Sequence, residues 1–352
     1  MTSHSNIASH HLARQFVALP PRKLKRVAAG VGFILALQAV CAACNIPVFR
    51  YALERWRPDN GQIVVFTKSR LTEKQTAKIR AIEGHSSSNG GLANVKVLRH
   101  EVGKDQDEDL DALWQRMSSA DNVRLPYVVV RSRVAKNKLV NSWRGPLNDF
   151  SAPSVLSSPA RSEISKRLLT GGSAVWLVIR SSDKAQNKAV ESVLESALKK
   201  LSAEVPLPEG IGLPGSELLS EVPLLMKFSV LTIDPEDAKE RHLVDFVHAL
   251  YPDAVKKKEP LVIPVFGRGR ALEVIPASQI NLQLVEDLTL FLCGACSCQV
   301  KEMNPGFDLL MSTDWKTELF GEDADEPTID RADSEESDGL PVLIPIPSGR
   351  KK

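Results

Sequence analysis

The sequence predicts an α/β protein in which two consecutive segments repeat one order of strands and helices. Two continuous apolar runs of the kind that form buried strands, Ile63–Phe66 and Val175–Ile179, begin 112 residues apart. Each run is followed by a predicted helix and, further along the chain, by a hairpin that opens at a proline, Pro126 or Pro260. The repeated order of elements carries this prediction, since no single motif does.

In the first segment, the strand at Ile63–Phe66 is followed by a helix that opens at Thr72. Thr72 and Gln75 have the spacing of a capping box, in which each side chain bonds the backbone of the other, and Gly84 suits the end of the helix. The further elements expected are a strand, a helix, two hairpin strands and a closing helix, at Val95–Leu98, Asp109–Met117, Leu125–Val130, Lys138–Trp143 and Arg161–Leu169.

In the second segment, the strand at Val175–Ile179 precedes a helix that opens at Asp183 and carries the clearest apolar stripe in the chain. Pro126 and Pro260 lie 134 residues apart, so this segment contains an insertion of about 22 residues, which the stretch Pro206–Gly215 largely explains. The further elements expected, in the same order as before, are Leu225–Ile233, Pro235–Leu250, Glu259–Ile263, Ala271–Ile275 and Gln279–Leu292.

This order of strand, helix, strand, helix, proline-led hairpin and closing helix resembles the thioredoxin-like fold. The resemblance covers Gly61–Val300 and predicts two tandem thioredoxin-like domains, at residues 61–170 and 171–308, each with a mixed sheet flanked by helices. In that family the proline before the hairpin is usually cis and lies beside the active site. The resemblance therefore makes Pro126 and Pro260 the candidate cis-prolines.

Thioredoxin-like oxidoreductases carry a Cys-x-x-Cys pair just after the first central strand, where a helix N-terminus lowers the pKa of the first thiol. The matching positions, Lys68–Leu71 and Arg180–Asp183, contain no cysteine, and Ser69 and Ser181 cannot exchange disulfides. We therefore expect no catalytic residue and no cofactor at these positions. A binding or scaffold role is favoured over catalysis.

Three cysteines, Cys293, Cys296 and Cys298, follow the last predicted helix. Cys293 and Cys296 form a C-x-x-C, but the end of a helix disfavours a thiolate that its start would stabilise. Three interpretations stay open: a structural disulfide or simple packing, a redox-active dithiol, and a site for a soft metal such as Cu(I) or Zn. The last two would make the chain an envelope thiol oxidoreductase or a metal carrier.

The first 43 residues have the three parts of an export signal. Four basic residues between Arg22 and Arg26 directly precede the 14-residue apolar run Val27–Val40, and small residues follow the run. No acidic residue occurs before Glu54. The sequence therefore predicts a signal or anchor segment at residues 1–43.

The end of this segment, Cys41-Ala42-Ala43-Cys44, resembles a bacterial lipobox, in which small residues precede an acylated cysteine. Ala42 and Ala43 fit the pattern, whereas Cys41 replaces the usual Leu, Val or Ile. Three outcomes stay open: lipidation at Cys44, an uncleaved anchor at Val27–Cys44, and cleavage with secretion. The first two attach the N-terminus to a membrane, with the bulk of the chain in the cell envelope, outside the cytoplasm.

Residues 44–60 form an aromatic segment that differs from the Gly/Ser spacer expected after a lipidated cysteine. The stretch Cys44–Trp56 resembles a segment of uncharacterised bacterial envelope proteins with repeated thioredoxin-like units, and no activity follows from that likeness. We expect Tyr51, Leu53 and Trp56 to pack on the first domain and to hold it close to the membrane.

Charge and composition limit the remaining possibilities. The net charge of +2 creates no field that favours nucleic acid, so no nucleic-acid partner is expected. No sequence motif of a serine hydrolase, zinc protease or P-loop protein is present. Residues 309–352 are predicted to be a disordered tail because Gly321–Asp338 holds nine acidic residues. We therefore expect a membrane-anchored envelope protein that binds a protein partner.

Overall fold

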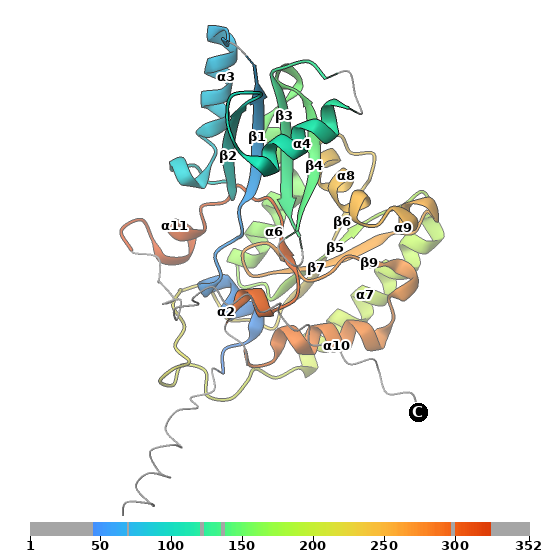
Figure 1. Cartoon of the computed structure of the whole chain (residues 1–352). Coiled ribbons are helices and arrows are strands. Elements are labelled where there is room, and N and C mark those ends of the chain that lie inside the picture. The colour runs from blue at the N-terminus through green and yellow to red at the C-terminus, as the bar shows by residue number, and fades with distance from the viewer. Residues whose placement is uncertain (1–44, 69, 120–122, 135–137, 297–299, 325–352) are drawn as a thin grey trace, which may run out of the picture. The chain divides into compact units, whose positions relative to one another are not determined.

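The computed structural model describes residues 45–68, 70–119, 123–134, 138–296 and 300–324. These residues form two mixed β-sheets flanked by helices, which confirms the predicted α/β class (Figure 1). Within these ranges, no helix is long and apolar enough to cross a membrane. The expectations for the export signal, for Cys44 and for Cys298 concern residues outside them, as does most of the predicted acidic tail.

The first sheet has the strand order β2-β1-β3-β4. Its strands are β1 (Gly61–Thr67), β2 (Val95–Glu101), β3 (Tyr127–Arg133) and β4 (Leu139–Pro146). β1 and β2 are parallel, with Val64 opposite Leu98, whereas β3 runs antiparallel to β1, with Val129 opposite Val64. β1 is therefore central and buried on both faces, which explains why its sequence is a continuous apolar run.

Helices cover both faces of this sheet. α3 (Glu73–Glu83) and α5 (Ala152–Leu156) pack on the face that bears Val65, and α4 (Glu108–Ser118) packs on the face that bears Phe66. Because alternate residues of a strand point to opposite faces, β1 contributes to both apolar clusters. Two short 3-10 helices lie in the connections: η2 (Ser87–Asn89) and η4 (Leu147–Asp149).

The second sheet has the strand order β10-β8-β7-β5-β6, and β9 also pairs with β7. Its strands are β5 (Ala174–Ile179), β6 (Phe228–Ile233), β7 (Leu261–Phe266), β8 (Arg270–Ala271), β9 (Ile275–Pro276) and β10 (Phe307–Asp308). β5 and β6 are parallel, with Trp176 opposite Val230, and β7 runs antiparallel to β5, with Ile263 opposite Leu177. The first three strands of each sheet therefore share one order and one set of directions.

The second sheet also has helices on both faces. The face with Trp176 and Val178, which we call the Trp176 face, is covered by α2, α7 and α10. The opposite face, with Leu177, is covered by α6 and α8. The bounds of these and the remaining helices are α2 (Val48–Arg55), α6 (Pro159–Leu169), α7 (Lys184–Glu204), α8 (Arg241–Leu250), α9 (Pro252–Lys256), α10 (Leu282–Cys293), α11 (Trp315–Phe320), η5 (Ala277–Gln279) and η6 (Lys301–Met303).

The aromatic segment after Cys44 packs on the second sheet, so the expectation that it packs on the first domain is wrong. Tyr51 and Trp56 belong to the apolar cluster of the Trp176 face, and Leu53 belongs to the cluster of the opposite face. The apolar pattern indicates burial, but it does not specify which sheet provides the complementary surface. Although α2 precedes β1 in the chain, it belongs to the second sheet.

The predicted boundary between the two segments, at residue 170, is too late. Ile164 and Leu168 of α6 lie in the same apolar cluster as Leu177 of the second sheet. The preceding helix α5 contributes Val155 and Leu156 to the cluster of the first sheet. The change from one sheet to the other therefore occurs at the short connection between α5 and α6.

The predicted disordered tail starts too early, at residue 309, because the first residues of this range are folded. Leu309, Met311 and Trp315 are buried against the second sheet, whereas Leu310 is buried in the cluster of the first sheet. Asn94 of the first sheet fixes this stretch, since its Oδ1 accepts a hydrogen bond from the Met311 amide at 2.7 Å. The physical reason is composition: the acidic block starts only after these apolar residues.

The helix expected to start at Pro235 starts instead at Arg241. Consecutive turns precede it: the Glu236 amide donates to Asp234 Oδ1 at 2.9 Å, and the Glu240 amide donates to the Asp237 carbonyl at 3.0 Å. Aspartate side chains stabilise such turns as readily as they cap helices, so an Asp-Pro pair does not distinguish the two.

Candidate functional site

The position after β1, where the family pattern would have a thiol pair, leads into a helix that its own side chains cap. Thr72 Oγ1 accepts a hydrogen bond from the Gln75 amide at 3.3 Å, and Gln75 Oε1 accepts one from the Thr72 amide at 2.9 Å. This is the capping box that the spacing predicts. Ser69 lies outside the described residues.

The equivalent position after β5 leads into α7, whose N-terminus is also capped by a side chain of the chain itself. One carboxylate oxygen of Asp183 accepts hydrogen bonds from the amides of Ala185 and Gln186, each at 3.0 Å. The hydrogen bonds from Gln186, first that of its backbone N–H and then that of its side chain, lower the pKa of Asp183. Asn187 holds Ser181 through both backbone groups, at 2.9 and 2.8 Å. The positive end of α7 is therefore neutralised by a carboxylate, in the place where a catalytic thiolate would be stabilised.

The two prolines that open the hairpins differ. The Leu125–Pro126 bond is cis, whereas the bond before Pro260 is not, so the expectation for Pro260 is wrong. The chain enters β7 from α9 through a tight turn in which Lys258 has a φ of 57°. In this turn the Glu259 amide donates to the Ala254 carbonyl at 2.9 Å.

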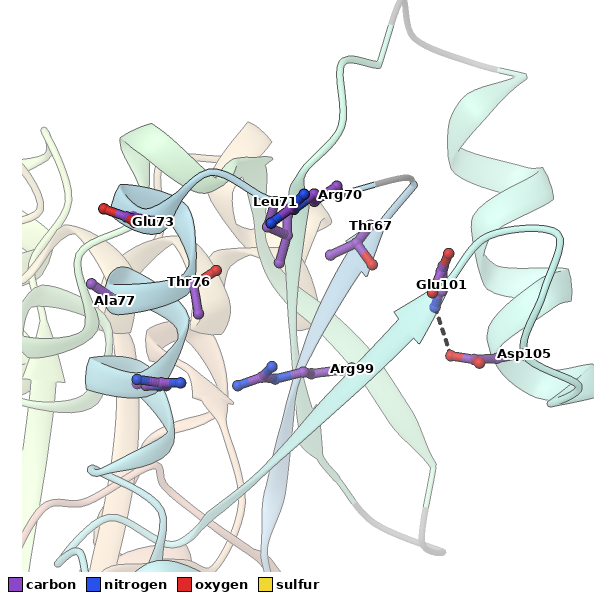
Figure 2. A pocket seen from close by; sticks show the side chains of 10 residues that line it. Thr67, Arg70, Leu71, Glu73, Thr76, Ala77, Arg99, Glu101 and Asp105 are labelled. Atoms are coloured by element: carbon purple, nitrogen blue, oxygen red, sulfur yellow. Dashed lines mark hydrogen bonds between the residues drawn. The ribbon is translucent and has the colours of Figure 1, made fainter.

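An open depression of about 630 Å³ lies at the carboxyl ends of β1 and β2, beside the first turns of α3. Figure 2 shows that its lining comes from the loop after β1, from α3 and from the end of β2. The depression therefore includes the position of the missing thiol pair. Its lining residues are Thr67, Arg70, Leu71, Glu73, Thr76, Ala77, Arg80, Arg99, Glu101 and Asp105.

The depression carries charges of both signs. Arg99 forms two bonds with Glu83, at 2.6 and 2.7 Å, and this interaction raises the pKa of Arg99. Arg70 and Arg80 form no side-chain hydrogen bond or ion pair with any described residue. At the other end, Asp105 accepts the Glu101 amide at 2.7 Å, the bond dashed in Figure 2. Two exposed guanidinium groups are thus available to a ligand that carries carboxylates.

The cysteines that the sequence singles out lie at the end of α10. Cys293 is a free thiol, so the disulfide expected within the C-x-x-C does not join it to Cys296. Both side chains are buried in the apolar cluster of the Trp176 face, and burial raises the pKa of Cys293 to about 12. Among the described residues no three His, Cys, Asp or Glu side chains are grouped to hold a metal ion.

The chain that follows Cys44 lies against this cysteine pair. The Cys296 amide donates to the Ile46 carbonyl at 2.9 Å, and the Val48 amide donates to the Gly294 carbonyl at 3.0 Å. Pro47 and Ala295 face each other in an antiparallel bridge. The sequence does not reveal this pairing, because about 250 residues separate the partners.

A buried ion pair joins α2 to the residues between α7 and β6, the 206–227 segment. Arg50 Nε lies 2.9 Å from Glu54 Oε1, and Arg50 also donates to the Val222 and Ser220 carbonyls at 2.6 and 2.8 Å. Glu54 accepts the amides of Leu219 and Ser220 at 2.9 and 3.0 Å. The 206–227 segment therefore lies against the N-terminal helix, as Figure 1 shows.

A second set of charges fixes the C-terminal end of α2. Arg268 donates to the Leu53 carbonyl at 2.7 Å, so it supplies a partner that the last turn of the helix lacks. Beyond the helix, Lys301 forms ion pairs with Asp59, at 2.9 Å, and with Asp308. These contacts hold residues 45–60 onto the second sheet along their length.

No protein-family model matches the chain, and no curated protein matches it in sequence. Among solved structures, it is similar to the first two thioredoxin domains of Naumovozyma dairenensis Eps1p, with 12% identity and a TM-score of 0.20. This match covers 69% of the chain and 93% of the Eps1p structure. At this TM-score the likeness does not establish a common fold.

Proposed function

We propose that the chain is a membrane-anchored envelope protein whose two degenerate thioredoxin-like domains bind a partner without catalysing thiol exchange. The fold part of the proposal is supported by the topology. In both sheets a parallel strand pair is followed by an antiparallel strand, with helices after the first and second strands. The cis bond at Pro126 lies before the third strand, as in that family.

The non-catalytic role is supported mainly by the side chains that cap the N-termini of α3 and α7. Catalysis in this family needs a thiol at the first turn of the helix, where the dipole lowers its pKa. Here α3 begins with the Thr72–Gln75 capping box, and α7 begins with the Asp183 carboxylate. Cys293, by contrast, lies at the C-terminal end of α10. Burial raises its pKa to about 12, which makes the thiol less reactive.

The depression beside α3 supports the binding role. Arg70 and Arg80 present exposed guanidinium groups to this depression, and Glu101 and Asp105 line it as well. Guanidinium groups bind carboxylates through two parallel hydrogen bonds. The proposed ligand is therefore an extended polypeptide segment with acidic side chains.

The test is a thiol–disulfide exchange assay on the full chain, with insulin disulfides as substrate and thioredoxin as positive control. We expect no turnover above the uncatalysed rate, with or without added Cu(I) or Zn. Turnover that disappears in the Cys296→Ser variant would replace this proposal with an oxidoreductase at the α10 cysteines. Stoichiometric metal uptake lost in the same variant would replace it with a metal carrier.

A further inference from the structure

Large apolar side chains that remain exposed are concentrated on two stretches of the chain. Of the eleven that are exposed among the described residues, eight lie in the 206–227 segment or between the last turn of α10 and η6. Scattered apolar residues are normal on a protein surface, but a concentration of them marks an interaction site. The eight are Leu207, Leu213, Leu219, Leu225, Leu290, Phe291, Val300 and Met303.

The 206–227 segment and the residues directly after α10 border Asn45, where the described chain begins, and η6 follows six residues after Ala295. The Asn45 amide donates to Ser216 Oγ at 2.9 Å, and a Cβ on Gly210 would lie 2.6 Å from Asn45 Nδ2 and 3.5 Å from Leu213. On the other side, the strand bridge at Pro47 joins the entering chain to the residues directly after α10. In Figure 1 the 206–227 segment and the end of α10 both lie beside α2.

We propose that Leu213, Leu290, Phe291 and Met303 form a surface that lies in the lipid interface of the membrane; this inference rests on the membrane attachment proposed above. The 14-residue apolar run that ends before Cys41 stands only a few residues before Asn45. Asn45 is already bonded to the folded body, so no spacer separates that body from an attached N-terminus. The side chains around Asn45 must then lie against the bilayer.

The charges around this surface determine which lipids it fits. Glu286 and Asp287 lie one helical turn before Leu290 and Phe291, and Glu302 is adjacent to Met303. The nearby Lys301 is buried and paired with Asp308. These acidic neighbours favour interfacial insertion into neutral lipid over electrostatic binding to anionic headgroups.

The experiment places the photoreactive residue p-benzoylphenylalanine at Phe291, at Met303 or at Leu92 of the full chain, expressed in cells. Leu92 is the matched control, because it is 51% exposed and lies in the connection before β2 of the first sheet. After irradiation, each sample is separated into membrane and soluble fractions and analysed for phospholipid adducts by mass spectrometry. We expect lipid adducts at Phe291 and Met303 and none at Leu92.

The outcomes separate this inference from the proposed attachment. If the chain is in the membrane fraction but positions 291 and 303 give protein adducts or none, attachment stands and the lipid surface is wrong. Adducts with residues 1–44 or 325–352 of the same chain would show that the chain covers its own apolar surface, which also overturns the inference. Equal lipid labelling at Leu92 would mean that no particular face meets the bilayer. A chain found wholly in the soluble fraction would overturn both proposals.

Discussion

The guanidinium of Arg50 and the carboxylate of Glu54 lie one turn apart in α2, with 2.9 Å between Nε and Oε1, and their side chains are 1% and 0% exposed. The two side chains also bond the 206–227 segment and the adjacent Arg55. A buried charge without a partner is costly, so this pair allows one way for the N-terminal helix to dock. The residues next to the predicted attachment point are therefore a fixed part of the second sheet's body.

Removal of the Glu54 carboxylate should strongly destabilise the protein. Glu54→Ala leaves Arg50 charged and buried, and we expect it to lower the free energy of unfolding by about 3–5 kcal/mol. The matched control is Glu83→Ala, since Arg99 and Glu83 are 44% and 26% exposed, and we expect about 1 kcal/mol or less there. Urea unfolding followed by tryptophan fluorescence measures both. Equal losses in the two variants would show that the Arg50–Glu54 pair does not secure α2.

His242 should make the stability depend on pH. Burial, together with the charge of Arg161, lowers the pKa of His242 from 6.5 to about 3. Below about pH 6.5, His242 binds a proton in the unfolded chain but stays neutral in the folded chain. Its contribution to the free energy of unfolding is therefore complete above about pH 6.5 and is lost progressively as the pH falls toward 3. Between pH 7.5 and 5 we expect a loss of about 2 kcal/mol from this residue. Urea unfolding at both pH values, compared between wild type and His242→Gln, measures it. Identical losses in the two proteins would contradict the burial of a neutral His242.

Cys293 should react with thiol reagents only after unfolding. Its burial raises the pKa to about 12, so almost no thiolate is present at pH 8. With Ellman's reagent at pH 8, we expect modification of Cys293 in the native protein to be at least about a hundredfold slower than in urea. Mass spectrometry after a quenched time course identifies the modified residue. Rapid native modification of Cys293 would favour the redox interpretation.

Reversal of charge in the depression should remove partner binding. With p-benzoylphenylalanine in place of Ala77, irradiation of cells should yield a discrete protein adduct. We expect the double variant Arg70→Glu/Arg80→Glu to lose most of it, at least about tenfold, because two guanidinium contacts to carboxylates are lost. The matched control, Lys96→Glu/Lys199→Glu, reverses two charges outside the depression and should retain the adduct. Equal adduct yields in both double variants would place the partner elsewhere.

The central strands were predictable because β1 and β5 are buried on both faces, and such strands read as continuous apolar runs. The capping box at Thr72 was also predictable, because the motif that forms it lies within four consecutive residues. The sheet against which α2 packs was not predictable, because the apolar pattern around Trp56 shows only that these residues are buried. Choosing between two sheets depends on packing over long sequence separations.

The candidate site was predictable in part. The absence of cysteine at Lys68–Leu71 is visible in the sequence, and the structure places the depression there. Arg99 could not be assigned to it, because its place follows from the parallel pairing that sets it opposite Val65. The different bonds at Pro126 and Pro260 were not predictable, because the two prolines hold the same place in the sequence pattern.

The most direct test of a membrane-anchored protein is the mass of its mature N-terminus in the membrane fraction. We expect a chain that begins at Cys44 and carries lipid, with residues 1–43 absent. An intact chain retained in the membrane would replace lipidation with an uncleaved anchor and would keep the attachment. An unmodified chain that begins at Met1 and is found in the soluble fraction would rule out membrane attachment.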